Sequence, residues 1–164
     1  MESTKLKAVL GILRISMGLI FLWAFFDKLL GLNFTTKPAA AWLAGGSPTS
    51  GFLQFGVHGP FADFFHSLAG NGLVDWLFML GLLFIGVSLT LGIFMKLGGW
   101  SGVMMLFLMY LAVGIQPEHH PFIDDHFIYF FVILALMWSN SEKYFGFGNK
   151  WNSTSLVQKY RILS

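Results

Sequence analysis

The sequence predicts an all-α integral membrane protein: a bundle of four transmembrane helices with a helical outer loop between the first two. Composition is the first observation behind this prediction, because 55% of the 164 residues are hydrophobic and only 11% are charged, against about 25% in an average soluble domain. The second is that four apolar stretches approach the roughly 20 residues needed to cross hydrocarbon. We expect residues 1–164 to form a single membrane domain.

The four expected spans cover about 6–30, 74–94, 97–115 and 122–138. The second and third are separated only by Met95-Lys96, which predicts a tight helical hairpin. Glycine recurs along this hairpin, and small residues let helices approach closely in lipid; they are Gly81, Gly86, Gly92, Gly98, Gly99, Gly102 and Gly114. A compact bundle follows, and the same small-residue faces would also allow a homo-oligomer.

The outer loop, 31–73, is too long to lack structure of its own. Pro38 can begin a short helix that Gly45-Gly46 closes. A second, amphipathic helix starts at Gly59-Pro60, with Phe61, Phe64, Phe65 and Leu68 at helical spacing. We expect it to lie in the outer interface or to fold over the bundle mouth. The tail, 139–164, carries Tyr, Trp and Lys suited to the headgroup layer, with no helix expected before about Thr154.

The distribution of Lys and Arg predicts the orientation. Four spans place both termini on one side, and that side collects Lys5, Lys7, Lys96, Lys143, Lys150, Lys159 and Arg161, whereas the other receives only Lys28 and Lys37. Both termini should therefore be cytoplasmic, in a multi-pass protein of the plasma membrane. The same topology puts all five histidines and six of the eight acids on the outer side. This asymmetry favours an outward-facing site over a merely polar rim.

Several classes of chemistry are excluded or disfavoured. The chain has no cysteine, which excludes disulfides, thiolate metal ligands and cysteine-bound clusters on this chain. A dispersed net charge of +2 gives no reason to expect nucleic acid as a partner. The N-terminus runs into the first apolar stretch without a small-residue cleavage site, so we expect a retained first helix.

The candidate site is the polar stretch 118–129, at the mouth of the fourth span. With Pro121 at the first helical position, Asp124 and Asp125 should fall at the end of the first turn, where the helix dipole favours negative charge. His126 and Tyr129 are three residues apart and share one stripe. A quinone needs hydrogen-bond donors at its carbonyls and a route for protons, which His, Asp and Tyr supply. We predict Asp125, His126 and Tyr129 as catalytic residues; the alternative is a structural polar cluster.

Other ionisable residues are candidates for binding the substrate or quinone, namely Arg14, Asp27, Lys28, His119, His120 and Asp124. Arg14 is the one charge deep in a span, and its alternative role is to bind helix-end carbonyls or pair with an acid. Asp27 and Lys28 could instead form a simple interfacial pair. His119, His120 and the acids that follow could ligate a metal, but their spacing matches no standard motif, so we do not expect one.

Some of these residues carry a resemblance. Leu13-Arg14, the run Gly18-Leu19-Ile20-Phe21-Leu22 and Asp27-Lys28-Leu29, with His120-Pro121-Phe122-Ile123-Asp124-Asp125-His126 before the last span, resemble the DoxX/DoxD family of four-helix membrane proteins. The chain is most similar to the DoxD-like subunit of thiosulfate:quinone oxidoreductase. The resemblance implies oxidation of thiosulfate to tetrathionate on the outer face, electron transfer to a membrane quinone, and a small DoxA-like subunit as partner.

Two hypotheses follow from different classes. In the first, the chain is an enzyme subunit of the thiosulfate dehydrogenase (quinone) type, with a quinone as electron acceptor. Without cysteine, a haem motif or a dinucleotide fingerprint, it must pass electrons directly to bound quinone or use a cofactor of its partner. In the second, it is a non-catalytic membrane anchor or assembly subunit of a redox complex. A slot beside His126 that opens to lipid would favour the first hypothesis, and closed packing there would favour the second. A transporter is a third possibility, and the lack of internal repeats in the sequence argues against it.

Overall fold

The computed structural model describes residues 4–113, 120 and 122–164, and all regular secondary structure among these residues is helical. Three helices are long and apolar enough to cross a membrane: α1 (Thr4–Leu30), α4 (Gly72–Leu91) and α5 (Met95–Val113). A fourth apolar helix, α6 (Asp125–Trp138), is shorter at 14 residues. The all-helical class is thus confirmed, and the three long helices suggest a multi-pass membrane protein.

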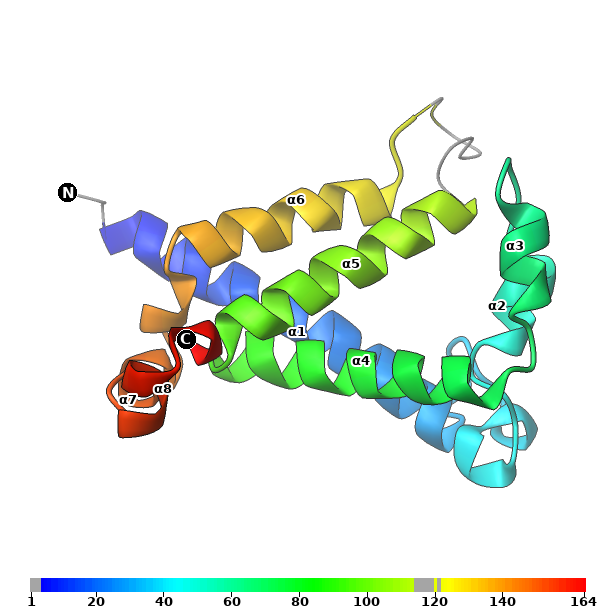
Figure 1. The fold of residues 1–164 in the computed structure, drawn as a ribbon, viewed down its shortest axis with the longest axis horizontal. Helices are drawn as coiled ribbons and strands as arrows, with labels where there is room; N and C mark the ends of the chain where they lie inside the picture. The colour runs from blue at the N-terminus through cyan, green and yellow to red at the C-terminus, as the bar shows by residue number, and fades with distance from the viewer. Residues whose placement is uncertain (1–3, 114–119, 121) are drawn as a thin grey trace.

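The long helices lie along one axis of the molecule (Figure 1), and α1 packs on α4, α4 on α5, and α5 on α6. Their shared core includes Met79, Ile85 and Ile133, each fully buried. The outward faces are equally apolar; Val9 and Leu77, for example, are 58% and 63% exposed. A helix that is hydrophobic all round is typical of a membrane span, because lipid covers the outer face.

Helix boundaries follow local capping. The side chain of Asn71 accepts the Leu73 amide at the start of α4, and Gly92, with φ 72°, ends it in the left-handed region. The helix α6 begins at Asp125, with Asp124 as its N-cap. The sequence predicts a last span over about 122–138, with Pro121 at the first helical position. The helix instead begins at Asp125, because the Asp124 side chain caps it there. Pro121 lies outside the described residues.

The outer segment between α1 and α4 contains two single-turn 3₁₀ helices, Pro38–Ala40 and Trp42–Ala44, and two short α-helices, α2 (Ser50–Phe55) and α3 (Ala62–Ser67). Gly45 ends the second 3₁₀ turn at φ 87°, close to the expected stop. The sequence analysis did not anticipate α2. The pair α2–α3 has its own apolar cluster with Ala112 of α5, and the His58 amide donates to the Ala112 carbonyl (3.1 Å). This part of the loop is therefore folded onto the end of α5.

The tail is more helical than expected. The helix α7 (Gly148–Asn152) precedes α8 (Ser155–Lys159), although we expected no helix before about Thr154. Tertiary contacts explain the difference: the Phe147 amide donates to the Leu91 carbonyl (2.8 Å), and the Trp151 ring contacts Phe94 with centroids 4.3 Å apart. Packing on the ends of α4 and α5 thus outweighs the weak helix propensity of Gly and Asn.

The helices α1 and α4 approach closely at paired glycines. A Cβ on Gly18 would lie 2.5 Å from the Thr90 backbone nitrogen and 3.0 Å from the Gly86 carbonyl oxygen. A Cβ on Gly86 would lie 2.9 Å from the Leu22 nitrogen. Both obstacles are backbone atoms that cannot move aside, so this crossing requires glycine.

Candidate functional site

Asp124 and His126 form a hydrogen-bonded pair at the start of α6. One carboxylate oxygen of Asp124 accepts the Phe127 amide (2.9 Å), which caps the helix. The other lies 2.6 Å from Nδ1 of His126. The side chains are only 15% and 26% exposed. A carboxylate that holds Nδ1 fixes the ring's orientation and leaves Nε2 to meet another group.

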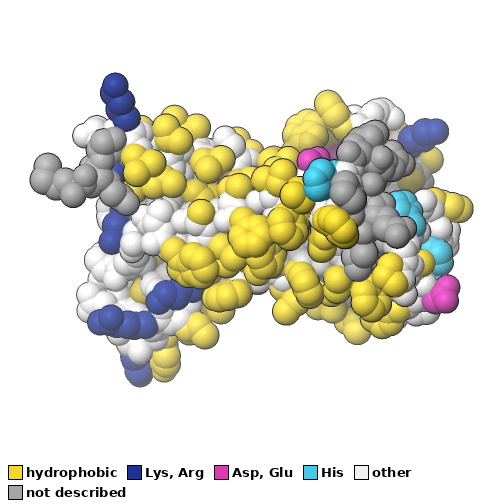
Figure 2. Space-filling view, turned by 90° about the horizontal axis from the view of Figure 1, so that it is seen from above, with side chains coloured by type: hydrophobic (Ala, Val, Ile, Leu, Met, Phe, Trp, Pro, Cys, Tyr) yellow, Lys and Arg dark blue, Asp and Glu magenta, His cyan; other side chains and the backbone are white. Residues whose placement is uncertain are grey.

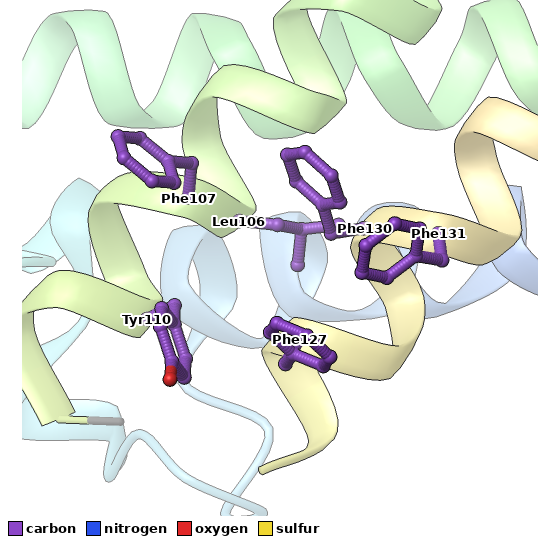
Figure 3. A pocket seen from close by; sticks show the side chains of 6 residues that line it. All are labelled: Leu106, Phe107, Tyr110, Phe127, Phe130 and Phe131. Atoms are coloured by element: carbon purple, nitrogen blue, oxygen red, sulfur yellow. The ribbon is translucent and has the colours of Figure 1, made fainter. Parts of the chain in front are cut away.

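An apolar groove of about 130 Å³ lies between α5 and α6. Figure 3 shows its aromatic rings from the two helices facing one another, and its walls are Leu106, Phe107, Tyr110, Phe127, Phe130 and Phe131. Phe127 directly follows His126 in the first turn of α6. The groove and the polar pair therefore both lie at the start of α6, although neither Asp124 nor His126 is among the residues that line the groove.

The turn before α6 is held to α5 by a residue that the sequence analysis missed. The Tyr110 hydroxyl donates to the Phe122 carbonyl (2.7 Å), and its ring lies 5.4 Å from that of Phe127. His120 strengthens the turn, because its Nδ1 accepts the amides of Phe122 (3.1 Å) and Ile123 (3.0 Å). The available signal was that Tyr110 is the one tyrosine in the third predicted span.

The remaining predicted residues of this stretch lie around the pair without lining the groove. Asp125 is exposed at the first position of α6. Tyr129 is half-buried and packs against the main core, so it shares the helix with His126 but does not line the groove. His119 lies outside the described residues.

Asp27 and Lys28 lie at the end of α1 that meets the outer segment. The Asp27 side chain is 1% exposed and accepts the amides of Phe34 (3.2 Å) and Thr35 (3.0 Å) and the Thr35 hydroxyl (2.7 Å). Lys28 is half-buried beside it. Within the described part of the chain, no hydrogen bond joins either residue to the Asp124–His126 pair. Asp27 instead fixes the turn that follows α1.

Arg14 is fully buried and does not line the groove. Its guanidinium donates only to main-chain carbonyls: those of Leu89 and Thr90 (3.0 Å) at the end of α4, and those of Ser141 (3.3 Å), Tyr144 (3.0 Å) and Phe145 (3.2 Å) in the tail. These contacts match the alternative role predicted for Arg14, which is to bind carbonyls at helix ends. The structure therefore does not bring Arg14 together with the other predicted binding residues.

A third buried charge, Asp75, was not among the predicted site residues. It is 7% exposed in the first turn of α4 and accepts the hydroxyls of Ser47 (2.8 Å) and Thr49 (2.5 Å) and the Thr49 amide (3.3 Å). The run Ser47-Pro48-Thr49-Ser50, rich in hydroxyl groups, was the signal for it. Asp75 thus ties the outer segment to α4.

No family model, no curated protein and no solved structure matches the chain. The DoxX/DoxD resemblance therefore stays a prediction that rests on its short motifs.

Among the described residues, no three or more His, Asp or Glu side chains gather closely enough to hold a metal ion. What the site offers chemically is one imidazole held by a carboxylate, beside a cleft of aromatic rings. Such a pair can donate or accept a proton at Nε2. The aromatic walls suit a flat apolar ring.

Proposed function

We propose that this chain is the membrane subunit of a quinone-linked oxidoreductase and that it takes up quinone at the α5–α6 groove. The observation that carries the proposal is Phe127, whose ring lines the aromatic groove and whose amide donates to Asp124, the carboxylate that holds His126. A quinone is an apolar ring that needs a proton at its carbonyl oxygens. The aromatic walls can bind the apolar ring, and the carboxylate-held imidazole can donate the proton.

The size of the groove limits what can enter it. At about 130 Å³ it is smaller than the roughly 300–1,000 Å³ of sites that enclose a drug-sized ligand. In our proposal the quinone ring lies against Phe127, Phe130 and Phe107, in offset or edge contact. Its long apolar tail runs out into lipid along α5 and α6, which requires no enclosure by protein.

The proton and electron balance assigns roles to the residues. Reduction of a quinone to a quinol consumes two electrons and two protons. His126 donates one proton from Nε2 to the nearer carbonyl oxygen, and Asp124 stabilises the ring orientation that makes this possible. We assign to Asp125, which is exposed at the first position of α6, the relay of the second proton from the outer solvent to the quinone.

The source of the electrons follows from the resemblance alone. Two thiosulfate ions joined as tetrathionate release the two electrons that the quinone takes. This chain has no cysteine and no haem or dinucleotide motif, so the electrons pass directly to the quinone or through a DoxA-like partner. We propose His120 and Lys28, two of the predicted binding residues, for receiving the dianion.

The proposal includes a four-span topology with cytoplasmic termini in the plasma membrane. Figure 2 supports the orientation: Lys and Arg gather at the end that carries the tail, and His lies at the opposite end. The helix α6 has 14 residues and so is about 21 Å long at 1.5 Å per residue. In the proposed topology α6 alone is too short to cross the hydrocarbon, so the polar turn before it completes the span at the outer face.

A second candidate function is a non-catalytic anchor or assembly subunit. The observation that favours it is the state of three other buried charged residues. Arg14, Asp27 and Asp75 are all hydrogen-bonded to main-chain groups or hydroxyls. Such side chains have structural roles, and the Asp124 cap could be one more of them.

The test is thiosulfate-dependent reduction of a decyl-type quinone by the purified protein, alone and with its co-purifying subunits. His126→Ala should lower the rate by about 100-fold, because general acid catalysis contributes roughly 10²–10⁴-fold. His66→Ala is the matched control, since His66 is an exposed histidine on α3, and it should keep the full rate.

Asp124→Asn separates catalysis from capping. Asn caps a helix about as well as Asp, so the melting temperature should stay close to that of the wild type while the rate falls with the loss of the carboxylate. Asp125→Asn serves as the neighbouring control for melting. Absence of activity in every preparation, with all variants stable and assembled, would favour the anchor function.

A further inference from the structure

A second cavity, of about 230 Å³, lies at the opposite end of the molecule from the groove, between the start of α5 and the tail. Its walls are Lys96, Asn152, Val157, Gln158, Arg161 and Ser164. Two of these side chains are cationic, two are amides and none is acidic. The side chains of this wall can therefore supply several hydrogen-bond donors and two positive charges.

The tail is docked on α5 in a way that builds this wall. The Lys96 ammonium donates to the Arg161 carbonyl (3.1 Å), and the Lys96 amide donates to the main-chain oxygen of Ser164 (2.9 Å). The Trp151 indole nitrogen donates to the Leu163 carbonyl (2.7 Å). The amide at the start of α5 is thus already occupied, and the cavity's donors are side chains.

Two groups in the wall lack a partner. The Arg161 guanidinium makes no hydrogen bond or ion pair within the part of the chain that the structure describes. The Oδ1 atom of Asn152 is buried without a hydrogen-bond partner among those residues. A buried polar atom left unpaired is costly. A ligand that accepts from Arg161 and donates to Asn152 would satisfy both.

The surroundings favour a lipid as the ligand. Apolar side chains next to the cavity are exposed, with Leu156 and Tyr160 at 50% and Ile162 at 62%. Tyr and Trp at this level suit the boundary between headgroups and acyl chains. Basic pockets on the cytoplasmic side of membrane helices commonly bind phosphorylated headgroups.

We infer that this cavity binds the phosphate of an anionic phospholipid headgroup, held by Arg161 and Lys96, with a headgroup hydroxyl donating to Asn152. Guanidinium binds phosphate oxygens in a bidentate manner, and the ammonium adds a second positive charge. The bound lipid would join the tail to α5. This inference does not depend on the proposed quinone chemistry, and its test does not measure activity.

The experiment is native mass spectrometry of the purified full chain in detergent with equal amounts of phosphatidylglycerol and phosphatidylcholine of matched acyl chains. The wild type should retain one phosphatidylglycerol in preference. Arg161→Gln and Lys96→Gln should each reduce that occupancy by about tenfold, the effect of losing one charge-assisted hydrogen bond. Lys150→Gln is the matched control, because this tail lysine does not line the cavity, and it should retain the lipid.

The outcomes that would overturn the inference are distinct. Equal retention of the two lipids by the wild type would show that headgroup charge is not recognised. Equal losses in Lys150→Gln and Arg161→Gln would indicate general attraction of the basic tail. Displacement of the lipid by excess inorganic phosphate would assign the cavity to a soluble anion. Arg161→Lys, which keeps the charge, should recover most of the occupancy, and failure to do so in a folded variant would also count against it.

Discussion

Arg14, Asp27 and Asp75 share one feature: each is buried and each is bound to a non-helical segment. Arg14 reaches the tail, Asp27 the turn after α1 and Asp75 the outer loop. A charge buried without partners would be very unfavourable. Irregular backbone near lipid has the complementary need, because its amides and carbonyls lack helical partners. Each buried charge gains hydrogen-bond partners, and each irregular segment gains partners for its polar groups. These side chains therefore hold the loops in place.

Arg14→Lys tests this role. A lysine ammonium offers three donors where the guanidinium offers five, so some carbonyls at the end of α4 and in the tail lose their partner. We expect a destabilisation of about 2 kcal/mol or more, measured as a lower melting temperature by tryptophan fluorescence in detergent. Arg161→Lys makes the same chemical change on an exposed side chain and should melt like the wild type. Equal melting of both variants would contradict the role assigned to Arg14.

Among the elements, the crossing of α1 and α4 depends most on a single residue type. Gly18→Ala would drive a methyl group against the Thr90 nitrogen, and since backbone cannot yield, the helices must separate. Overpacking of this kind costs about 1–3 kcal/mol. Gly72→Ala is the control, because a Cβ there meets nothing within 4 Å, and it should be neutral or slightly stabilising. Thermal melting compares the two, and a Gly18→Ala variant as stable as Gly72→Ala would argue against close packing at this crossing.

The sequence predicted the elements unevenly, for physical reasons. The three long helices start only two residues earlier than expected. The prediction is this close because a long apolar stretch is a strong local signal. The helix α7 could not be foreseen, since it depends on Trp151 packing against Phe94, a contact between distant parts of the chain. Likewise, the polar stretch before α6 was visible in the sequence, whereas the groove beside it was not, because its walls come from two helices.

Capping illustrates the same limit on a smaller scale. Asp124 was expected inside the first turn, and it became the N-cap because its side chain reaches the Phe127 amide. Sequence offered two consecutive acids and no way to choose between them. The pairing of Asp124 with His126 accompanies that choice, so the site's main contact depended on where the helix starts.

For the whole molecule, the separation of charge between its two ends predicts a labelling pattern. The chain has no cysteine, so a single introduced thiol reports on one place. Ser153→Cys in the tail and His58→Cys in the outer segment both substitute exposed residues. With cytoplasmic termini, a membrane-impermeant maleimide should label His58→Cys in intact cells and Ser153→Cys only after permeabilisation. The reverse pattern would invert the proposed topology and place the site inside.

The Arg14 contacts also order events during synthesis. Arg14 and Ser141 are 127 residues apart, so at about 5–20 residues per second the ribosome needs roughly 6 to 25 seconds to deliver the partner after the arginine. Until then a guanidinium in the first span has no tail carbonyls to bind, and its side chain must extend toward the headgroups. The first helix to be inserted therefore completes its contacts last. The Arg14 contacts can form only after the tail has been synthesised.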